Sequence, residues 1–514
     1  MAEKKDLTAL VAALESAGKA TGDQLWAAVR NALAPEGLIN NLSEALRISA
    51  PETEELLKQN GLGDLVMQAK IARQEQAAQE AVGEAVAREP LSSPFPELFS
   101  TVVSAPGKVS AALEEAASQL VDSILPTMAG DPFAELYRGH VPDYYDSFMK
   151  NEAPKIRDYA ARAFGEDGPR YLLNSGIGAN EQFNHFIAHL HNTNPRRKCE
   201  WLVVNSPRQL VRLPSEATVE NTLFMEFSRS GKTEETVKIH EYTPREAKRI
   251  VFANGGPLKD LGERDGNLVL KLPAEVSGRF GRDKTPILLA PMLVAGLDTD
   301  GFWKKIQEAI EAFDLTDPEN LPLKIAKFIY TQQKARGTNH IYLGCDNDAL
   351  IMLGDELTQF WNEGVNKGAN DITMSRYLGL PRDSHMNLEA ILADHKTKMA
   401  ICLFADKLVP DVLHPMIHRE IDPINPDHSG LRFGDEERIL AESNYVRLSE
   451  LMPCVKVMLH GRPAIEHAAV ISQLWADITF CYSRLMNIDP GSNPEVKAVR
   501  DRAVKLLAEG IKIG

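Results

Sequence analysis

The sequence predicts an α/β fold in which two doubly wound parallel sheets follow a helical N-terminal region. From about residue 140 onward, short apolar runs alternate with helical stretches, which is the pattern of strands and helices in a parallel sheet. Residues 1 to about 130 are instead rich in Ala and Glu and carry apolar residues at helical spacing. A helical stretch at 299–337, broken at Asp317-Pro318, separates two alternating regions.

These patterns divide the chain into three parts. Residues 1–135 form the helical N-terminal region, in which the apolar stripe Leu7–Leu14 has helical spacing. Residues 136–320 form a first α/β lobe, and residues 321–514 form a second α/β lobe that ends in C-terminal helices. A long amphipathic helix is predicted at 464–488.

Eight apolar runs predict the strands of the two sheets. Five belong to the first lobe and three to the second: Tyr171–Leu173, Trp201–Val204, Thr222–Phe227, Arg249–Phe252 and Leu268–Leu272, then His340–Leu343, Met399–Leu403 and Val455–Met458.

Charge and composition exclude several classes of function. The 514 residues carry a formal net charge of −15 with a pI of about 5.4, so we expect no nucleic-acid partner and no anionic membrane surface. An anionic substrate would need a locally basic pocket. The sequence has no apolar run near the ~18 residues of a membrane span, and its N-terminus lacks the apolar core of a secretory signal.

The cysteines and histidines predict a reduced compartment and no metal. Five scattered cysteines without a CxxC pair suit the cytoplasm and give no zinc site. The groups His185/His189/His191 and His414/His418 lack a carboxylate placed to complete a ligand set, so we expect no metal.

The stretch Ser228–Thr236 is the strongest local signal for a binding site. It separates the apolar run Thr222–Phe227 from a helical continuation at Val237–His240. The start of a helix presents unpaired backbone N–H groups and a partial positive charge. A loop between strand end and helix start is therefore a cradle for an anion, most naturally a phosphate.

The side chains of this loop suit the same role. Gly231 allows close backbone approach, and the loop lacks the first glycine of a Walker A motif. The alternative is helix capping, because Ser or Thr followed three residues later by Glu is a capping box. The candidate phosphate-binding residues are Ser228, Ser230, Lys232, Thr233 and Thr236.

A second loop, Ser175–Asn180, follows the predicted strand at Tyr171 and contains Gly-Ile-Gly. Ligands of open α/β sheets bind outside the carboxyl ends of the strands, where both loops fall. Together the two loops resemble those of the sugar isomerase (SIS) fold, and more specifically of the phosphoglucose isomerase family. Gly176–Gly178 match the family's opening turn, whereas Ala179 and Asn180 replace its Gly and Ser.

Further motifs follow in the family's order and extend the resemblance over about residues 140–505. The segment 277–281 resembles the family's Gly-Gly-Arg-Phe-Ser, and Gln359 precedes Glu363 by the family's four residues. Asp383-Ser-His385 lies where the family has its catalytic histidine. Asn493–Arg500 resembles a C-terminal motif that ends in lysine.

The resemblance implies an aldose–ketose isomerase that interconverts glucose 6-phosphate and fructose 6-phosphate through a cis-enediol(ate), without a redox cofactor. Glu363 would be the base, His385 of a neighbouring subunit the ring-opening acid/base, and Arg279 the stabiliser of the oxyanion. The neighbouring subunit implies a homodimer with a shared site. Arg500 would replace the catalytic lysine. The remaining substrate contacts would be Gly178, Asn180, Gln359 and Asn493.

Two other functions stay open because Asn180, Asn493 and Arg500 depart from the family at substrate contacts. One is an isomerase of another anionic sugar, and the other is a non-catalytic sugar-phosphate-binding regulator on the same fold. For Glu363 the structural alternative is an ion pair with Lys367 at i+4.

Overall fold

The structure is a computed structural model, and it divides the chain into two compact units. One comprises residues 1–86 and 408–450, and the other comprises residues 87–407 and 451–514. Of the first unit the structure describes mainly helix α20 (Phe433–Leu451). The described residues are 86–128, 130–139, 141–176, 181–273, 278–367, 372–379, 388–393, 395–406, 433–491 and 502.

The first sheet has five strands in the order β4-β3-β5-β6-β7, and every neighbouring pair is parallel. Strands β3 and β5 are buried along their whole length, as expected for a parallel sheet covered on both faces. All five strands confirm the predicted runs: β3 (Tyr171–Ser175), β4 (Glu200–Val204), β5 (Thr222–Phe227), β6 (Lys248–Phe252) and β7 (Leu268–Leu270).

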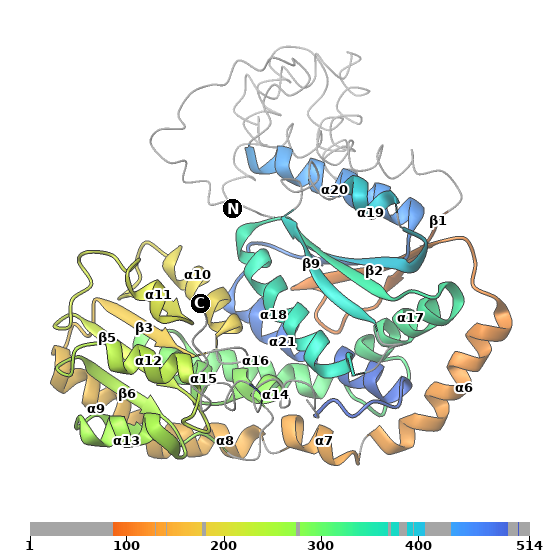
Figure 1. Cartoon of the computed structure of the whole chain (residues 1–514). Coiled ribbons are helices and arrows are strands. Elements are labelled where there is room, and N and C mark those ends of the chain that lie inside the picture. The colour runs from red at the N-terminus through yellow and green to blue at the C-terminus, as the bar shows by residue number, and fades with distance from the viewer. Residues whose placement is uncertain are drawn as a thin grey trace, which may run out of the picture. The chain divides into compact units, whose positions relative to one another are not determined.

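Helices cover both faces of this sheet (Figure 1). On one face, Ile239 of α12 packs on Leu173 and Phe224, and Leu258 of α13 packs on Val251. Helices α10 and α15 contact each other as well as strands β4 and β3. The helices of the first lobe are α9 (Ala153–Phe164), α10 (Gln182–Asn192), α11 (Pro207–Leu210), α12 (Glu234–Tyr242), α13 (Gly256–Arg264), α14 (Gly278–Gly281), η4 (Arg282–Lys284) and α15 (Pro286–Ala295).

The second sheet has six strands in the order β1-β2-β11-β10-β8-β9. Its core of β11, β10, β8 and β9 is parallel, whereas β2 runs antiparallel to β11. The strands β8, β10 and β11 confirm the three predicted runs. The bounds are β1 (Val86–Leu91), β2 (Phe99–Pro106), β8 (His340–Cys345), β9 (Thr373–Gly379), β10 (Lys398–Ala405) and β11 (Cys454–Leu459).

Strands β1 and β2 correct the prediction that residues 1–135 are helical throughout. The run Thr101–Ser104 has the β-branched composition of a strand, and Val103 pairs with Val455 of β11. This pairing joins segments far apart in the sequence, so its partner cannot be read from the local pattern. Helices begin only afterwards, with α6 (Ala111–Met128), α7 (Pro132–Ala134), η1 (Glu135–Gly139), α8 (Val141–Ser147) and η2 (Phe148–Glu152).

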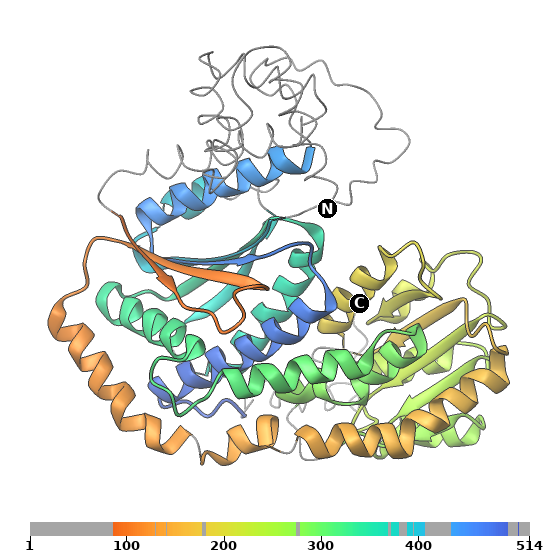
Figure 2. The same ribbon diagram turned by 180° about the vertical axis from the view of Figure 1, so that it is seen from behind.

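The long helices α16, α17, α18 and α21 pack together beside the second sheet. In Figures 1 and 2, the orange helices α6 to α9 run along the lower edge from the second sheet to the first. Helices α16, α17 and α18 all contact α21, which is buried on every side. The bounds are α16 (Thr299–Ala312), α17 (Leu321–Arg336), α18 (Asp348–Val365), α19 (Glu389–Ala393), η6 (His395–Thr397) and α21 (Ile465–Leu485).

Among the described helices, none has both the length and the apolar composition needed to cross a bilayer.

Candidate active site

The hydroxyl-rich loop lies at the switch point of the first sheet, where β3 and β5 are neighbours and their connections diverge. Strand β3 continues toward β4 on one side, and β5 continues toward β6 on the other. The loop leaves the carboxyl end of β5 and enters α12 at Glu234. Open α/β sheets bind their ligands at such a point, so the loop is placed as an anion cradle requires.

Gly231 gives this loop a conformation that other residues resist. Its φ is +65°, and a Cβ there would lie 1.7 Å from the carbonyl oxygen of Gly255. The Leu258 N–H donates to Gly231 O at 3.0 Å, which ties the loop to the start of α13. Glycine is therefore required by both the backbone angle and the close approach of the neighbouring loop.

Ser228 and Thr233 bind each other across the loop. Their hydroxyl oxygens are 2.8 Å apart, and the Thr233 N–H donates to Ser228 Oγ at 3.3 Å. Thr233 is the N-cap residue of α12, yet its side chain makes no capping bond. The geometry thus differs from the capping-box alternative, and it leaves the start of α12 to a ligand.

The other loop residues differ in exposure. Thr236 is fully buried, and its Oγ1 has no hydrogen-bond partner among the described residues. Ser230 and Lys232 are exposed, and Ser230 Oγ accepts from the Lys232 N–H at 3.2 Å.

Glu363 lies in the last turn of α18, with its carboxylate held on both oxygens. Gln359 Nε2 donates to Oε1 at 2.7 Å, and Arg279 Nε donates to Oε2 at 3.0 Å. The side chain of Glu363 is 31% exposed, whereas that of Arg279 is 7% exposed. Lys367 Nζ contacts the backbone carbonyl of Glu363, so its hydrogen bond is not the predicted i+4 side-chain pair.

Two neighbours of Glu363 fix the end of α18 to the start of β9. Trp361 Nε1 donates to Ile372 O at 2.9 Å. The Asn362 side chain donates to Met374 O at 2.7 Å and accepts from the Met374 N–H at 2.8 Å. On the other side, a Cβ on Gly364 would lie 2.5 Å from Thr479 of α21. The helix end that carries the carboxylate is thus held from two directions.

Arg279 connects the first lobe to this helix end. Its Nη1 donates to Glu363 O at 2.5 Å and to Pro490 O at 2.8 Å. The adjacent Phe280 ring meets the Phe360 ring edge-on, with centroids 4.5 Å apart. Pro490 was not among the predicted site residues. It lies in the predicted turn after the long helix, and a carbonyl partner of this kind leaves no signal in the sequence.

The structure therefore gathers two groups of predicted residues. Arg279, Gln359 and Glu363 form one group, and the loop from Ser228 to Thr236 forms the other. The remaining candidates lie outside the described residues: Gly178, Asn180, His385, Asn493 and Arg500.

The switch point of the second sheet is acidic. Asp346, 3% exposed, follows β8 and accepts from the Ala405 N–H at 3.0 Å and from Asn347 Nδ2 at 2.7 Å. Burial is the largest cause that raises the pKa of Asp346, to about 8. Asn347 caps α18 by accepting from the Leu350 N–H, and Asp348 lies in the first turn.

Two of the histidines considered above as metal ligands, His185 and His191, contact protein groups in the structure. His185 Nε2 is 3.2 Å from Glu181, and His191 Nε2 donates to Cys199 O at 2.8 Å. Within the described ranges, no group of three or more His, Cys, Asp or Glu is placed to hold a metal.

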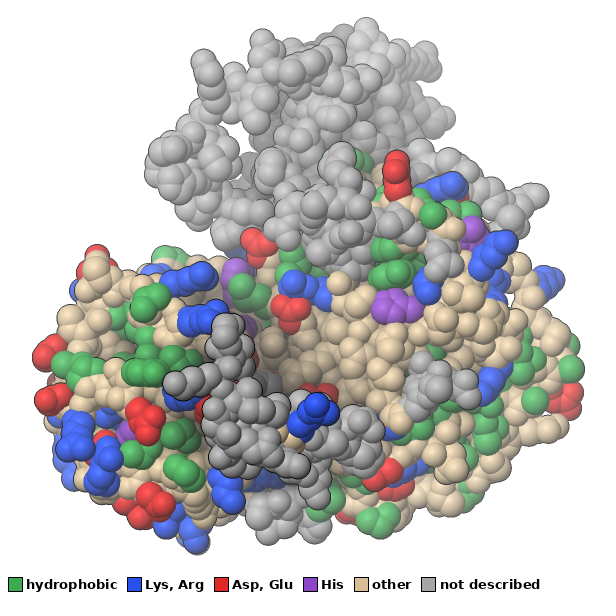
Figure 3. All heavy atoms as spheres, viewed as in Figure 1, with side chains coloured by type: hydrophobic (Ala, Val, Ile, Leu, Met, Phe, Trp, Pro, Cys, Tyr) green, Lys and Arg blue, Asp and Glu red, His purple; other side chains and the backbone are tan. Residues whose placement is uncertain are grey.

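The surface of the first lobe carries charges of both signs. On the face in Figure 3, Lys and Arg are interspersed with Asp and Glu over the first lobe.

Comparison with known proteins agrees with this architecture, although no protein-family model matches the chain. Glucose-6-phosphate isomerase of Methanocaldococcus jannaschii is 22% identical over 314 residues, which is 59% of this chain and 76% of that protein. The enzyme of the same name from Thermus thermophilus is 31% identical over 228 residues, 41% of this chain and 54% of that protein.

Among solved structures, a glucose-6-phosphate isomerase from Chlamydia trachomatis superposes with a TM-score of 0.63 at 13% identity. The match covers 85% of this chain and 95% of that one. A Thermus thermophilus protein described as hypothetical superposes with a TM-score of 0.59 at 20% identity, covering 77% of this chain and 95% of that one.

The paired parallel sheets define an SIS-type sugar isomerase fold. Within that class, the sequence matches confirm the resemblance predicted above: the chain is a relative of the glucose-6-phosphate isomerases.

Proposed function

We propose that this chain is an aldose–ketose isomerase that interconverts glucose 6-phosphate and fructose 6-phosphate through a cis-enediol(ate). The observation that carries the proposal is the carboxylate of Glu363, held by Gln359 at 2.7 Å and by Arg279 at 3.0 Å. The hydroxyl loop of the first lobe supplies a phosphate cradle in the same compact unit. The relatives named above carry this activity in their names.

In the proposed mechanism, Glu363 carries the proton from C2 to C1 on one face of the sugar. The guanidinium of Arg279 is one hydrogen bond from this carboxylate, so it also reaches an oxygen bonded to the neighbouring carbon. A charge that is permanent and largely shielded from water stabilises the enediolate oxygen as it forms. Gln359 orients Glu363, because its amide occupies the other carboxylate oxygen.

The phosphate loop acts at the end of the sugar that does not react. Ser228, Thr233 and Thr236 with the first N–H groups of α12 hold the phosphate, and this binding orients the reacting carbons against Glu363. Isomerisation moves protons without net oxidation, so these residues need no redox cofactor.

We further propose a cytoplasmic homodimer in which His385 opens the ring in the partner's site, while Arg500 and Asn493 complete the substrate contacts. Gly178 and Asn180 would line the first-lobe loop. The resemblance to the isomerase family supports these roles. The five cysteines are buried thiols, which is consistent with a reducing compartment. We place the activity in glycolysis and gluconeogenesis on the same basis.

A coupled assay with fructose 6-phosphate tests the proposal. We expect Glu363→Gln to lower kcat by about 10³-fold with a nearly unchanged KM, because an amide of the same shape cannot accept the proton. Asp355→Asn is the matched control. This carboxylate lies on the same helix, pairs with Arg376 at 2.8 Å, and should leave turnover intact.

Three outcomes would change the conclusion. Full turnover by Glu363→Gln would show that another group is the base. Tight hexose-phosphate binding without turnover by the wild-type chain would favour a sugar-phosphate-binding regulator. Turnover of a different anionic sugar, with fructose 6-phosphate inert, would keep the chemistry and change the substrate.

A further inference from the structure

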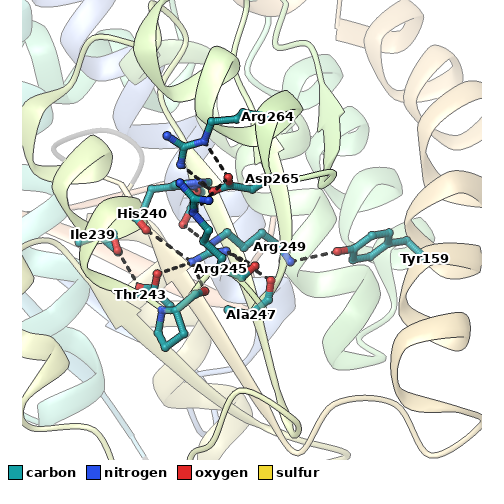
Figure 4. Close-up of polar contacts among 11 residues, drawn as sticks. Tyr159, Ile239, His240, Thr243, Arg245, Ala247, Arg249, Arg264 and Asp265 are labelled. Carbon is teal, nitrogen blue, oxygen red and sulfur yellow. Dashed lines mark hydrogen bonds and ion pairs between the residues drawn. The ribbon is translucent and has the colours of Figure 1, made fainter.

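A buried network of charged side chains surrounds His240 of α12, with Asp265 and Arg249 beside it (Figure 4). Neither the mechanism nor the resemblance uses this network. At its centre, His240 Nδ1 is 2.6 Å from Glu226 Oε2, and His240 Nε2 is 3.2 Å from Asp265 Oδ2. The side chains are 1%, 0% and 5% exposed, respectively. Each ring nitrogen thus faces a carboxylate oxygen away from water.

Three arginines contact the two carboxylates, and the exposed Arg245 is the most distant, with its Nε 3.9 Å from Asp265 Oδ1. Arg249 has no exposed surface, and its Nε is 3.4 Å from Glu226 Oε1. The Arg249 guanidinium also donates to Thr243 O at 2.9 Å and to Pro244 O at 2.7 Å. Arg264 donates to both oxygens of Asp265, at 2.8 and 3.0 Å. Burying these charges costs free energy, and the partners offset it only in this arrangement.

The network joins the three elements that bound the phosphate loop. Glu226 is on β5, two residues before Ser228, and His240 is on α12, the helix that the loop enters. Asp265 follows α13 directly, and the first turn of α13 receives the Leu258–Gly231 hydrogen bond described above. The two helices are therefore linked twice. The start of α13 is bonded to the loop before α12, and the residue after α13, Asp265, contacts His240 in the last turn of α12.

The phosphate loop depends on where α12 starts. A ligand oxygen bound by backbone N–H groups and hydroxyls loses affinity when these donors move by fractions of an ångström. Helix α12 has only nine residues, so its position is set by its packing rather than by its own stability. The contact between Glu226 and His240 joins the last turn of α12 to β5, and so it fixes the position of the helix whose first turn follows the loop.

We propose that His240 is a positioning residue for phosphate recognition. Through its contact with Glu226 it fixes the last turn of α12 against β5. Because the helix is short and rigid, this contact also sets the position of its first turn, and so His240 sets the affinity for the phosphoryl group without touching it. This inference rests on the proposed function of the loop. It assigns to His240 and Glu226 an effect on KM rather than on kcat, because the reacting carbons lie at the other end of the substrate.

Two substitutions separate the two contacts of His240. The amide nitrogen of His240→Asn replaces Nδ1 and keeps a donor toward Glu226. The amide nitrogen of His240→Gln replaces Nε2 and keeps a donor toward Asp265 instead. The dissociation constant of inorganic phosphate, measured by calorimetry on the full chain, and the kcat and KM for fructose 6-phosphate are compared for both.

We expect His240→Gln to raise the phosphate dissociation constant and KM about tenfold, as for a lost hydrogen bond to a charged group, with kcat within about twofold. His240→Asn should raise both by about threefold or less, because the donor toward Glu226 remains. Arg264→Gln is the control: it removes the arginine at the exposed end of the network and should leave both constants unchanged.

The proposal is overturned if folded His240→Gln binds phosphate as the wild type does, or if kcat falls while KM stays. Asp265→Asn keeps the test decisive even if the histidine variants fail to fold. It leaves the Glu226 contact in place, so unchanged phosphate binding supports the proposal and a tenfold loss overturns it. A wild-type chain that neither binds phosphate nor converts fructose 6-phosphate would refute the proposed function itself.

Discussion

The carboxyl edges of the two sheets have the same topology and opposite chemistry. At the switch point of the first sheet, strand β5 leads into a loop of hydroxyls and a glycine, and the Thr233 side chain leaves α12 uncapped. At the switch point of the second sheet, strand β8 leads into the buried Asp346, and Asn347 caps α18. In the first sheet the N–H groups at the start of α12 have no side-chain cap. In the second sheet the Asn347 side chain already accepts from an N–H group at the start of α18.

This difference shows how two similar lobes divide the work of one site. An anion is attracted to the uncapped start of α12, whereas Asn347 already caps the start of α18, so we expect the phosphate at the first lobe. The second lobe contributes instead through the far end of α18, where Glu363 meets Arg279. We therefore expect phosphate binding at the start of α12 and the chemistry at the end of α18.

Among the proposed substitutions, the largest effect on substrate binding is expected from Gly231→Ala, which distorts the phosphate loop of the first lobe. The added Cβ would lie 1.7 Å from Gly255 O at a φ of +65°, so the loop backbone must move. We expect KM for fructose 6-phosphate to rise by about 100-fold or more, because several donors to the phosphate shift together.

Gly266→Ala is the control for backbone strain alone. Gly266 has a similar φ of +71°, but a Cβ there meets nothing within 4 Å. The substitution should lower the free energy of unfolding by about 1 kcal/mol and leave KM unchanged. Equal KM changes in both variants would show that the close approach at Gly231 is irrelevant to binding.

A smaller effect is expected from the two hydroxyls that meet at 2.8 Å. Ser228→Ala and Thr233→Val should each raise KM about tenfold with little change in kcat, as for a lost hydrogen bond to a charged ligand. Their effects should not add in the double variant, because the hydroxyls also position each other.

Thr243→Val serves as the control at the other end of α12. Its hydroxyl donates to Ile239 O at 2.7 Å, so the change should cost stability and leave KM alone. A fall in kcat with constant KM in Ser228→Ala or Thr233→Val would place the loop at the reacting carbons and reverse the division of work between the lobes.

The sequence predicted those parts of the fold that leave a local pattern. The core strands read as apolar runs, and all eight predicted runs are strands. Strand β9 was missed because Thr373–Gly379 has neither an apolar run nor a strict alternation of polar and apolar residues. Strand β2 was missed because it pairs with β11, a partner far along the chain, and β1 was missed with it because β1 joins the sheet only as the neighbour of β2.

The site was predictable where residue type alone carries chemistry. Glu363, Gln359 and Arg279 were assigned by motif, and the structure brings their side chains into contact. The groups that hold them were not predictable: Asn362 acts through the backbone of β9, and Pro490 acts through its carbonyl. A histidine such as His240 read as part of an ordinary helix because its two carboxylate partners, on β5 and after α13, become neighbours only when the sheet forms.

The smallest effect on activity is expected from Asp346→Asn in the second lobe. This substitution tests whether the second lobe takes part in phosphate binding. The carboxyl has an ordinary pKa of 3.8 and a folded pKa of about 8, so the folded state holds a proton that the unfolded state releases. The free energy of unfolding therefore falls as pH rises from about 4 to about 8.

The amide introduced by Asp346→Asn cannot ionise, and its oxygen still accepts from the Ala405 N–H. The melting temperature of the variant should exceed that of the wild type at pH 8, and the gap should narrow toward pH 5, while KM stays unchanged. Parallel melting curves would show that Asp346 is ionised in the folded chain. A lower KM would show instead that its charge reaches the substrate, and the separation of the two edges would fail.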